Sequence, residues 1–277
     1  MQKLLLWIAI TFLVLATTLS YLTKESRVKH VLFGIGWLLI GFHWINLPKY
    51  YFLKEDLFNG LLFIAGSFLA WALAFIEAKL LLEKKEIDII TYLGQAAAIA
   101  TIIYFPLRNL SSFSSFSLEY IVAEHTFLLL KTIGAPISQN GSVLTFSAEE
   151  SITKVSIVFA CTGIESIALF YGAIIPSPDS LTNKVKALIA TGPIIYILNL
   201  FRNTFVVYAT GNKWFSAINF FGLEGSFVIS HHVIAKAGSV IAIFLIAYFV
   251  LKILPGLRNI FFSIFELPKK IKEEELI

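Results

Sequence analysis

Three short segments of the sequence carry residue types that could act together in acyl transfer. The first, ACTGIES at Ala160–Ser166, contains Cys161, the only cysteine of the chain. The second is NLFRN at Asn199–Asn203, which contains Arg202, and the third is SHH at Ser230–His232. A thiolate is the reactive form of cysteine, a neighbouring imidazole or cation favours it, and an arginine can hold a developing oxyanion. The three segments therefore predict thioester chemistry.

The spacing of these segments places them at one depth if each borders a membrane-spanning helix. Cys161 lies 15 residues before Pro176, and Ala187 lies 15 residues before Arg202. Both distances are about 22 Å along a helix that rises ~1.5 Å per residue. The following apolar run begins on the same side with His231 and its neighbour. We therefore expect three helices to converge on one site near a membrane surface.

Three further polar residues flank this set. Glu165 follows Cys161 by one helical turn, and a carboxylate at that depth is costly unless it is paired or protonated. We expect an ion pair with Arg202 or a hydrogen bond with Asn199. Asn199 and Asn203 flank the arginine and are expected to orient its guanidinium group.

Each of these residues also has a simpler interpretation. A lone cysteine in an apolar helix is often a small core residue, and an arginine at a helix end often extends to the headgroups. Their occurrence together at one depth favours the functional interpretation. His43 and His125 have no ligand-type neighbours in the sequence, and no phosphate-loop or GxSxG motif occurs. We therefore expect no metal, no cofactor and no serine hydrolase.

The elements that hold these segments are those of a membrane protein. Hydrophobic residues make up 57% of the 277 residues, charged residues make up 14%, and the mean hydropathy is +0.80. This composition excludes an ordinary soluble domain and predicts an all-α polytopic membrane protein with a single membrane domain, 1–277. The net charge is +4, and the basic residues lie between apolar runs. Their position is better explained by a role in membrane orientation and by contact with anionic lipid than by a nucleic-acid partner.

Seven apolar runs are long enough to span a bilayer. They cover residues 4–22, 30–47, 58–80, 88–107, 162–176, 187–209 and 233–252. The first run resembles a signal peptide, but its cleavage pattern is poor, and we expect a retained helix.

The rest of the chain divides around these spans. A more polar segment at 117–133 predicts an interfacial helix. The runs Val143–Phe146 and Ile152–Phe159 alternate as the strands of a small hairpin do, and 134–142 is turn-like. The expected segments are an N-terminal four-helix half at 1–108, an extracytoplasmic cap at 109–160, catalytic helices at 161–254 and a cytoplasmic tail at 255–277, whose charged end, 269–277, is expected to be solvated.

The distribution of basic residues predicts the orientation. The connections after the first, third and fifth spans, together with the tail, carry 13 of the 22 lysine and arginine residues. Cytoplasmic connections retain such an excess. The site is therefore expected on the extracytoplasmic side of the cell membrane.

The motifs resemble those of a known family of membrane enzymes. ACTGIES, NLFRN and SHH followed by Ala235 and Gly238 are similar to the Cys, Arg and His motifs of the exosortase/archaeosortase family, most of all its archaeosortase branch. The resemblance covers about 153–245. It implies a cysteine protease or transpeptidase that recognises a C-terminal sorting signal on secreted surface proteins, cleaves near a short motif and transfers the protein to a membrane lipid. The signal consists of that motif, a transmembrane helix and a basic cluster.

The resemblance also implies residue roles. Cys161 would be the nucleophile, Arg202 the substrate or oxyanion partner, and His231 the acid/base. Adjacent helix positions point about 100° apart, so one histidine is expected to face the thiol, and His232 is the alternative. Some archaeosortases carry arginine as the third basic residue, so Lys236 competes for the role.

Two other classes of function stay open. A transporter or channel could use Glu165 and Arg202 in a polar pathway, but such sites tend to lie near the bilayer midplane, often within inverted repeats. No repeat is visible in the sequence. A scaffold protein would tolerate substitution of all three motif residues.

Overall fold

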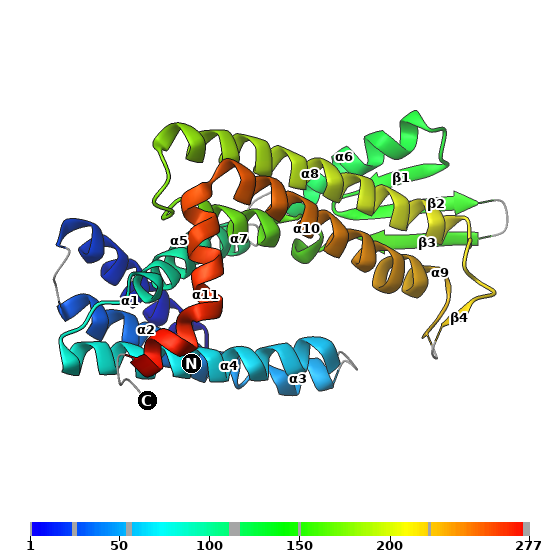
Figure 1. Cartoon of the computed structure of the whole chain (residues 1–277). Helices are drawn as coiled ribbons and strands as arrows, with labels where there is room; N and C mark the ends of the chain where they lie inside the picture. Colours follow the sequence, from blue (N-terminus) through cyan, green and yellow to red (C-terminus); the bar gives the residue numbers. More distant parts are fainter. Residues whose placement is uncertain are drawn as a thin grey trace. The chain divides into compact units, whose positions relative to one another are not determined.

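A computed structural model describes residues 2–23, 27–53, 57–110, 117–148, 151–220 and 223–273. The chain forms two compact units that interleave along the sequence (Figure 1). The first unit comprises 1–102, 172–178 and 256–277, and the second comprises 103–171 and 179–255. The expected single membrane domain, with its consecutive segments, stays a prediction.

The protein is an all-α polytopic membrane protein with little sheet, as the composition predicts. Among the described residues, six helices are long and apolar enough to cross a membrane. The seventh expected span, 162–176, contains the shorter apolar helix α7 (Ile164–Ile174) of 11 residues. At ~1.5 Å per residue α7 is about 16 Å long, half of a hydrocarbon core of ~30 Å.

The first unit consists of helices. In it α1 packs on α2, and α2 packs on α4. Phe33, Leu80 and Ile90 are fully buried in its core. Its elements in chain order are α1 (Gln2–Leu22), α2 (Arg27–Trp44), α3 (Pro48–Phe52), α4 (Leu57–Glu83), most of α5 (Asp88–Leu110) and α11 (Pro255–Glu273).

Helix α11 lies in the region that was expected to be a tail. The chain is helical from Pro255 to Glu273, so the expected tail contains a helix, and the solvation of its charged end stays a prediction. Phe261, Phe262 and Phe265 are exposed on this helix. The frequent charges hide the segment from a hydropathy scan, although the spacing of its aromatic residues is amphipathic. Residues 274–277 lie outside the described part.

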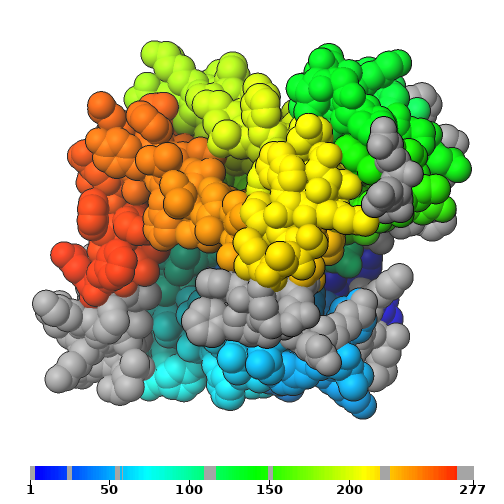
Figure 2. All heavy atoms as spheres, turned by 90° about the vertical axis from the view of Figure 1, so that its right-hand side faces the viewer, coloured from blue at the N-terminus to red at the C-terminus, as the bar shows by residue number. Residues whose placement is uncertain are grey.

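The second unit holds the three motif segments. Helix α6 packs against α8 and against a small sheet, and α8 lies beside α10 along the unit (Figures 1 and 2). Val122, Leu130, Leu144 and Val207 form part of its core. Its elements are α6 (Leu118–Thr132), β1 (Ile137–Asn140), β2 (Val143–Ala148), β3 (Ser151–Ser156), the 3₁₀ turn η1 (Phe159–Cys161), α7, α8 (Leu181–Gly211), β4 (Asn219–Phe220), β5 (Leu223–Glu224), α9 (Ser226–Val228), the π-helix η2 (Ile229–Ile234) and α10 (Ala235–Ile253).

The expected cap contains the predicted helix and hairpin. Ser117 caps α6 by accepting a hydrogen bond from the Tyr120 backbone N–H at 3.1 Å. Strands β2 and β3 pair antiparallel, with Leu144 opposite Val155. The sheet has a third strand, β1, which was not predicted because its sequence, ISQN, has only one apolar residue and no alternation. Residues 111–116 and 149–150 of this region lie outside the described part.

Candidate active site

Cys161 ends the 3₁₀ turn η1, and its backbone is tied to α8 by two side chains. Asn199 and Asn203 both donate through Nδ2 to the carbonyl oxygen of Cys161, at 2.7 and 2.9 Å. The two asparagines are four residues apart and so lie on one face of α8. The Cys161 side chain is half-buried against the core of the second unit. The amide pair therefore fixes the cysteine at one level of α8.

Gly163 completes this attachment. Its φ of +79° lies in the left-handed region, and a Cβ added there would come within 3.2 Å of the Cβ of Asn199. The backbone can approach Asn199 this closely only because the residue has no side chain. Thr162 bonds within its own turn, from Oγ1 to the carbonyl of Phe159 at 2.7 Å. The local backbone conformation thus explains why a glycine occupies this position of ACTGIES.

Arg202 and His231 form the second part of the site. Arg202 Nη2 lies 3.3 Å from His231 Nε2, in hydrogen-bond contact. A guanidinium group can only donate, so Nε2 accepts, and the imidazole is neutral with its proton on Nδ1. Among the described residues, buried Nδ1 of His231 has no hydrogen-bond partner.

The local helix geometry explains how His231 reaches Arg202. The histidine lies in η2, a π-helical turn, and such wider turns are frequent at functional sites. The Phe227 ring stacks on the imidazole with centroids 5.1 Å apart and an angle of 10°. At the start of the turn, the buried Ser230 hydroxyl contacts Thr210 Oγ1 of α8 at 3.3 Å. The π-helix is therefore held against α8 by Ser230 and by His231 itself.

The alternatives for the third role lie farther out. His232 is exposed and meets His231 edge-on, with ring centroids 4.6 Å apart. Lys236 is exposed on α10. Of the three candidates, His231 is the residue with a hydrogen-bond contact to Arg202.

Glu165 has a different partner from the one that the sequence suggested. Its Oε1 accepts a hydrogen bond from the Tyr104 hydroxyl at 3.0 Å, and that hydroxyl accepts from Arg108 Nη1 at 3.2 Å. The expected pairing with Arg202 or Asn199 is therefore wrong. The i, i+4 spacing of Tyr104 and Arg108 was visible in the sequence, but nothing there connected α5 with a residue 61 positions away.

The asparagines also act on a different group. We expected Asn199 and Asn203 to orient the guanidinium of Arg202, yet both amides bond to the Cys161 carbonyl. Consecutive helix residues point in different directions, which explains why neighbours in NLFRN contact different parts of the site. His125, for which the sequence showed no ligand-type neighbours, contacts the Tyr196 hydroxyl at 2.6 Å through Nδ1.

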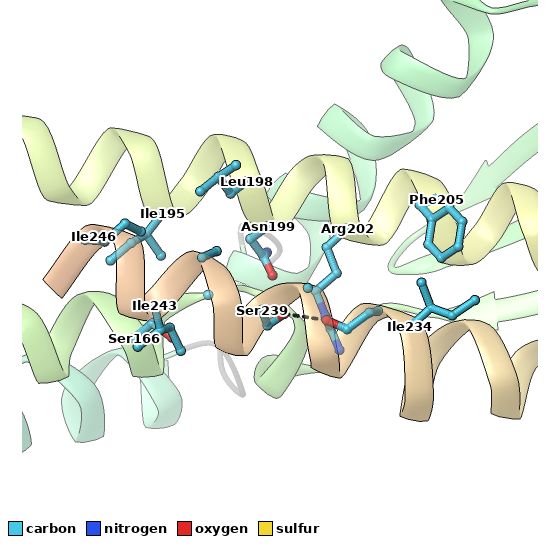
Figure 3. A pocket seen from close by; sticks show the side chains of 14 residues that line it. Ser166, Ile195, Leu198, Asn199, Arg202, Phe205, Ile234, Ser239, Ile243 and Ile246 are labelled. Carbon is cyan, nitrogen blue, oxygen red and sulfur yellow. Dashed lines mark hydrogen bonds between the residues drawn. The ribbon is translucent and has the colours of Figure 1, made fainter. Parts of the chain in front are cut away.

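A cavity of about 320 Å³ opens beside these residues. Gly163 and Ser166 border it, and the side chains of Asn199 and Arg202 reach from α8 toward α10 (Figure 3). The remaining lining is mainly aliphatic. Within the described residues, no three His, Cys, Asp or Glu side chains come together as metal ligands. The motif segments offer a thiol, a guanidinium and an imidazole, and of these three groups the guanidinium of Arg202 borders the mainly aliphatic cavity.

Comparison with known proteins identifies the family. The family model described as transmembrane exosortase matches residues 2–234, which include all three motif segments. Archaeosortase A of Haloferax volcanii is 27% identical over 262 residues, covering 86% of this chain and 84% of that protein. Archaeosortase A of Natronomonas pharaonis is 25% identical over 280 residues, covering 92% and 85%. No solved structure matches the chain. The resemblance inferred from the motifs is thus confirmed, and the chain belongs to the transmembrane exosortase family.

Proposed function

We propose that this protein is a cysteine transpeptidase that processes the C-terminal sorting signal of secreted surface proteins at the extracytoplasmic face of the cell membrane. The main supporting observation is that three residues within one five-residue stretch of α8, 199–203, contact both halves of the site. Asn199 and Asn203 hold the backbone of Cys161, and Arg202 contacts His231. Family membership and the names of the curated relatives support a role in protein sorting.

The proposed reaction has two steps. In the first step Arg202 moves from His231 Nε2 to the oxygen of the scissile carbonyl, which leaves Nε2 free to take the thiol proton of Cys161. The thiolate then attacks the scissile carbonyl while Arg202 stabilises the oxyanion. The C–N bond breaks, the leaving amine takes the proton from the imidazolium, and a thioester is formed. A nucleophilic group of a membrane lipid then attacks the thioester, the C–S bond breaks, and Cys161 leaves as a thiolate. The imidazole of His231 takes the proton of the lipid nucleophile and passes it to the thiolate, which restores the thiol of Cys161.

The hydrogen-bond partners of Glu165 and Arg202 give no support to the transporter alternative. Glu165 bonds to Tyr104, whereas Arg202 contacts His231. The two charged side chains that a polar pathway would use thus have separate partners.

The decisive experiment uses a reporter client, defined as a secreted reporter fused to the C-terminal segment of a surface protein from the same host. We expect Cys161→Ala and Cys161→Ser to abolish its processing, measured as the intact mass of the reporter with and without the protein. Ala160→Ser, at the exposed neighbouring position, is the matched control and should process normally. Normal processing by both cysteine variants would show that the covalent mechanism is wrong.

The acid/base assignment is tested in the same assay. We expect His231→Ala to reduce processing more than His232→Ala, because His231 contacts Arg202. General acid–base catalysis contributes about 10²- to 10⁴-fold, so the loss should lie in that range. A larger loss from His232→Ala would reverse the assignment.

A further inference from the structure

A second cavity continues the one beside Arg202. It has a volume of about 560 Å³ and also lies between α8 and α10. The two cavities share four lining residues, Leu198, Gly238, Ala242 and Ile246. Together they form one apolar groove, called here the α8/α10 groove.

The groove is nearly as long as the hydrocarbon core of a bilayer is thick. It extends from Phe205 to Ala190 on α8 and from Ile234 to Ile253 on α10. At ~1.5 Å per residue these stretches are about 22 and 28 Å long, against a hydrocarbon core of ~30 Å. A lipid chain confined to one leaflet would occupy only about half of that length. The length therefore matches a transmembrane segment.

The floor of the groove has space that this chain leaves unfilled. Gly238 and Ala242 lie one turn apart on α10 and line both cavities. A Cβ added to Gly238 would have no atom within 4 Å, although glycine is unfavourable inside a helix relative to alanine. Small residues four positions apart allow the backbone of a neighbouring helix to approach closely in a membrane. On the rim, Ile241, Leu245 and Phe249 are exposed.

One end of the groove is the candidate active site. Asn199 and Arg202, which contact Cys161 and His231, are also part of its lining (Figure 3). A helix in the groove would thus have one end beside the proposed nucleophile, and the chain just outside that end would supply the scissile peptide bond.

We propose that the α8/α10 groove binds the transmembrane helix of the client protein along its whole length. Gly238 and Ala242 receive a large aliphatic side chain of that helix, one to two turns inside the membrane from the level of Ile234. The identification of the helix as the client's rests on the proposed function. The depth at which the helix binds in the groove then determines which peptide bond reaches Cys161.

The first test fills the groove with a side chain. Gly238→Leu and Ala242→Leu should reduce processing of the reporter client by about tenfold or more, the range in which one misfitting hydrophobic group discriminates substrates. Ala237→Leu is the control, because Ala237 is exposed and lines neither cavity. Unchanged thermal unfolding of Gly238→Leu would show that it folds, as its open surroundings predict.

The second test asks which molecule occupies the groove. In the Gly238→Leu background, replacing large residues of the client helix by alanine, one at a time, should restore processing at one depth. A lipid in the groove could not respond to a change in the client. Failure of every such replacement to restore processing, or normal processing by both groove variants, would overturn the proposal.

A third measurement separates this proposal from the proposed mechanism. A photoreactive amino acid at position 246 should crosslink to the reporter client in a Cys161→Ala protein, whereas the same residue at exposed position 244, outside the groove lining, should not. The crosslink reports helix binding even if Cys161 is not the nucleophile. A crosslinked mass that corresponds to lipid alone would contradict the proposal.

Discussion

Asn199 and Asn203 donate to the same oxygen, the carbonyl of Cys161, and this shared acceptor is the most specific contact of the site. A carbonyl oxygen has two lone pairs, so both bonds can form at once. Asn203 is only 3% exposed, and its amide would lose its partner without regaining water if the turn moved. The two asparagines thus fix the position of the Cys161 backbone, and we expect them to act by positioning rather than by proton transfer.

We expect Asn203→Ala to lower the free energy of unfolding by about 1–3 kcal/mol, the cost of leaving a buried polar group unpaired. It should also lower kcat of reporter processing more than it raises KM, because the cysteine is displaced while the groove is intact. In a double-mutant cycle with Asn199→Ala the two effects should be non-additive, since they share one acceptor. Strictly additive losses would indicate two independent roles.

At the scale of the elements, the site depends on two unusual turns rather than on the long helices. The 3₁₀ turn η1 holds Cys161, and the π-helix η2 holds His231. Both turns contact α8, a regular helix of 31 residues. The two irregular elements carry the proposed nucleophile and acid/base, and α8 holds both elements in place.

Gly163→Ala tests the first of these turns. The substitution adds strain of roughly 1–2 kcal/mol at a positive φ and also forces the new Cβ against Asn199. We expect it to reduce processing as well as thermal stability. Gly134→Ala is the matched control, because Gly134 has a φ of +75° but no atom within 4 Å of an added Cβ. Equal loss of processing in both variants would mean that only backbone strain matters.

The long apolar helices and the strands of the hairpin could be predicted from the sequence, because hydrophobic length and alternation are local signals. The motif residues could be predicted to converge for the same reason, since each borders an apolar run. The partner of Glu165 and the pairing of buried His30 with Glu77, at 2.5 Å, depend on helix packing between residues 61 and 47 positions apart. The sequence has no local signal for either contact.

At the scale of the whole molecule, the family match covers residues of both compact units, and the described spans make the protein a multi-pass membrane protein. The extracytoplasmic orientation of the site stays a prediction, which rests on the excess of basic residues on one set of connections. Because the chain has one cysteine, a thiol reagent reports on one position.

A membrane-impermeant maleimide added to intact cells should label Cys161, because its side chain is half-buried rather than enclosed, and the site is expected outside. In a Cys161→Ala background, a cysteine placed at Lys252, at the opposite end of α10, should react only after permeabilisation. Labelling of Lys252→Cys in intact cells would reverse the orientation. Cys161→Ala without a second thiol is the blank.

The π-helix η2 has one further consequence, which concerns rotation. Each residue of an α-helix turns the chain by about 100°, so the wider turn at 229–234 sets the angular phase of everything that follows. His231 faces Arg202 and Gly238 faces the groove only in this phase. We expect deletion of a single residue from the turn to rotate either His231 or Gly238 away from α8, although every motif residue would still be present. The number of residues between these two positions is therefore expected to be as constrained as their identity.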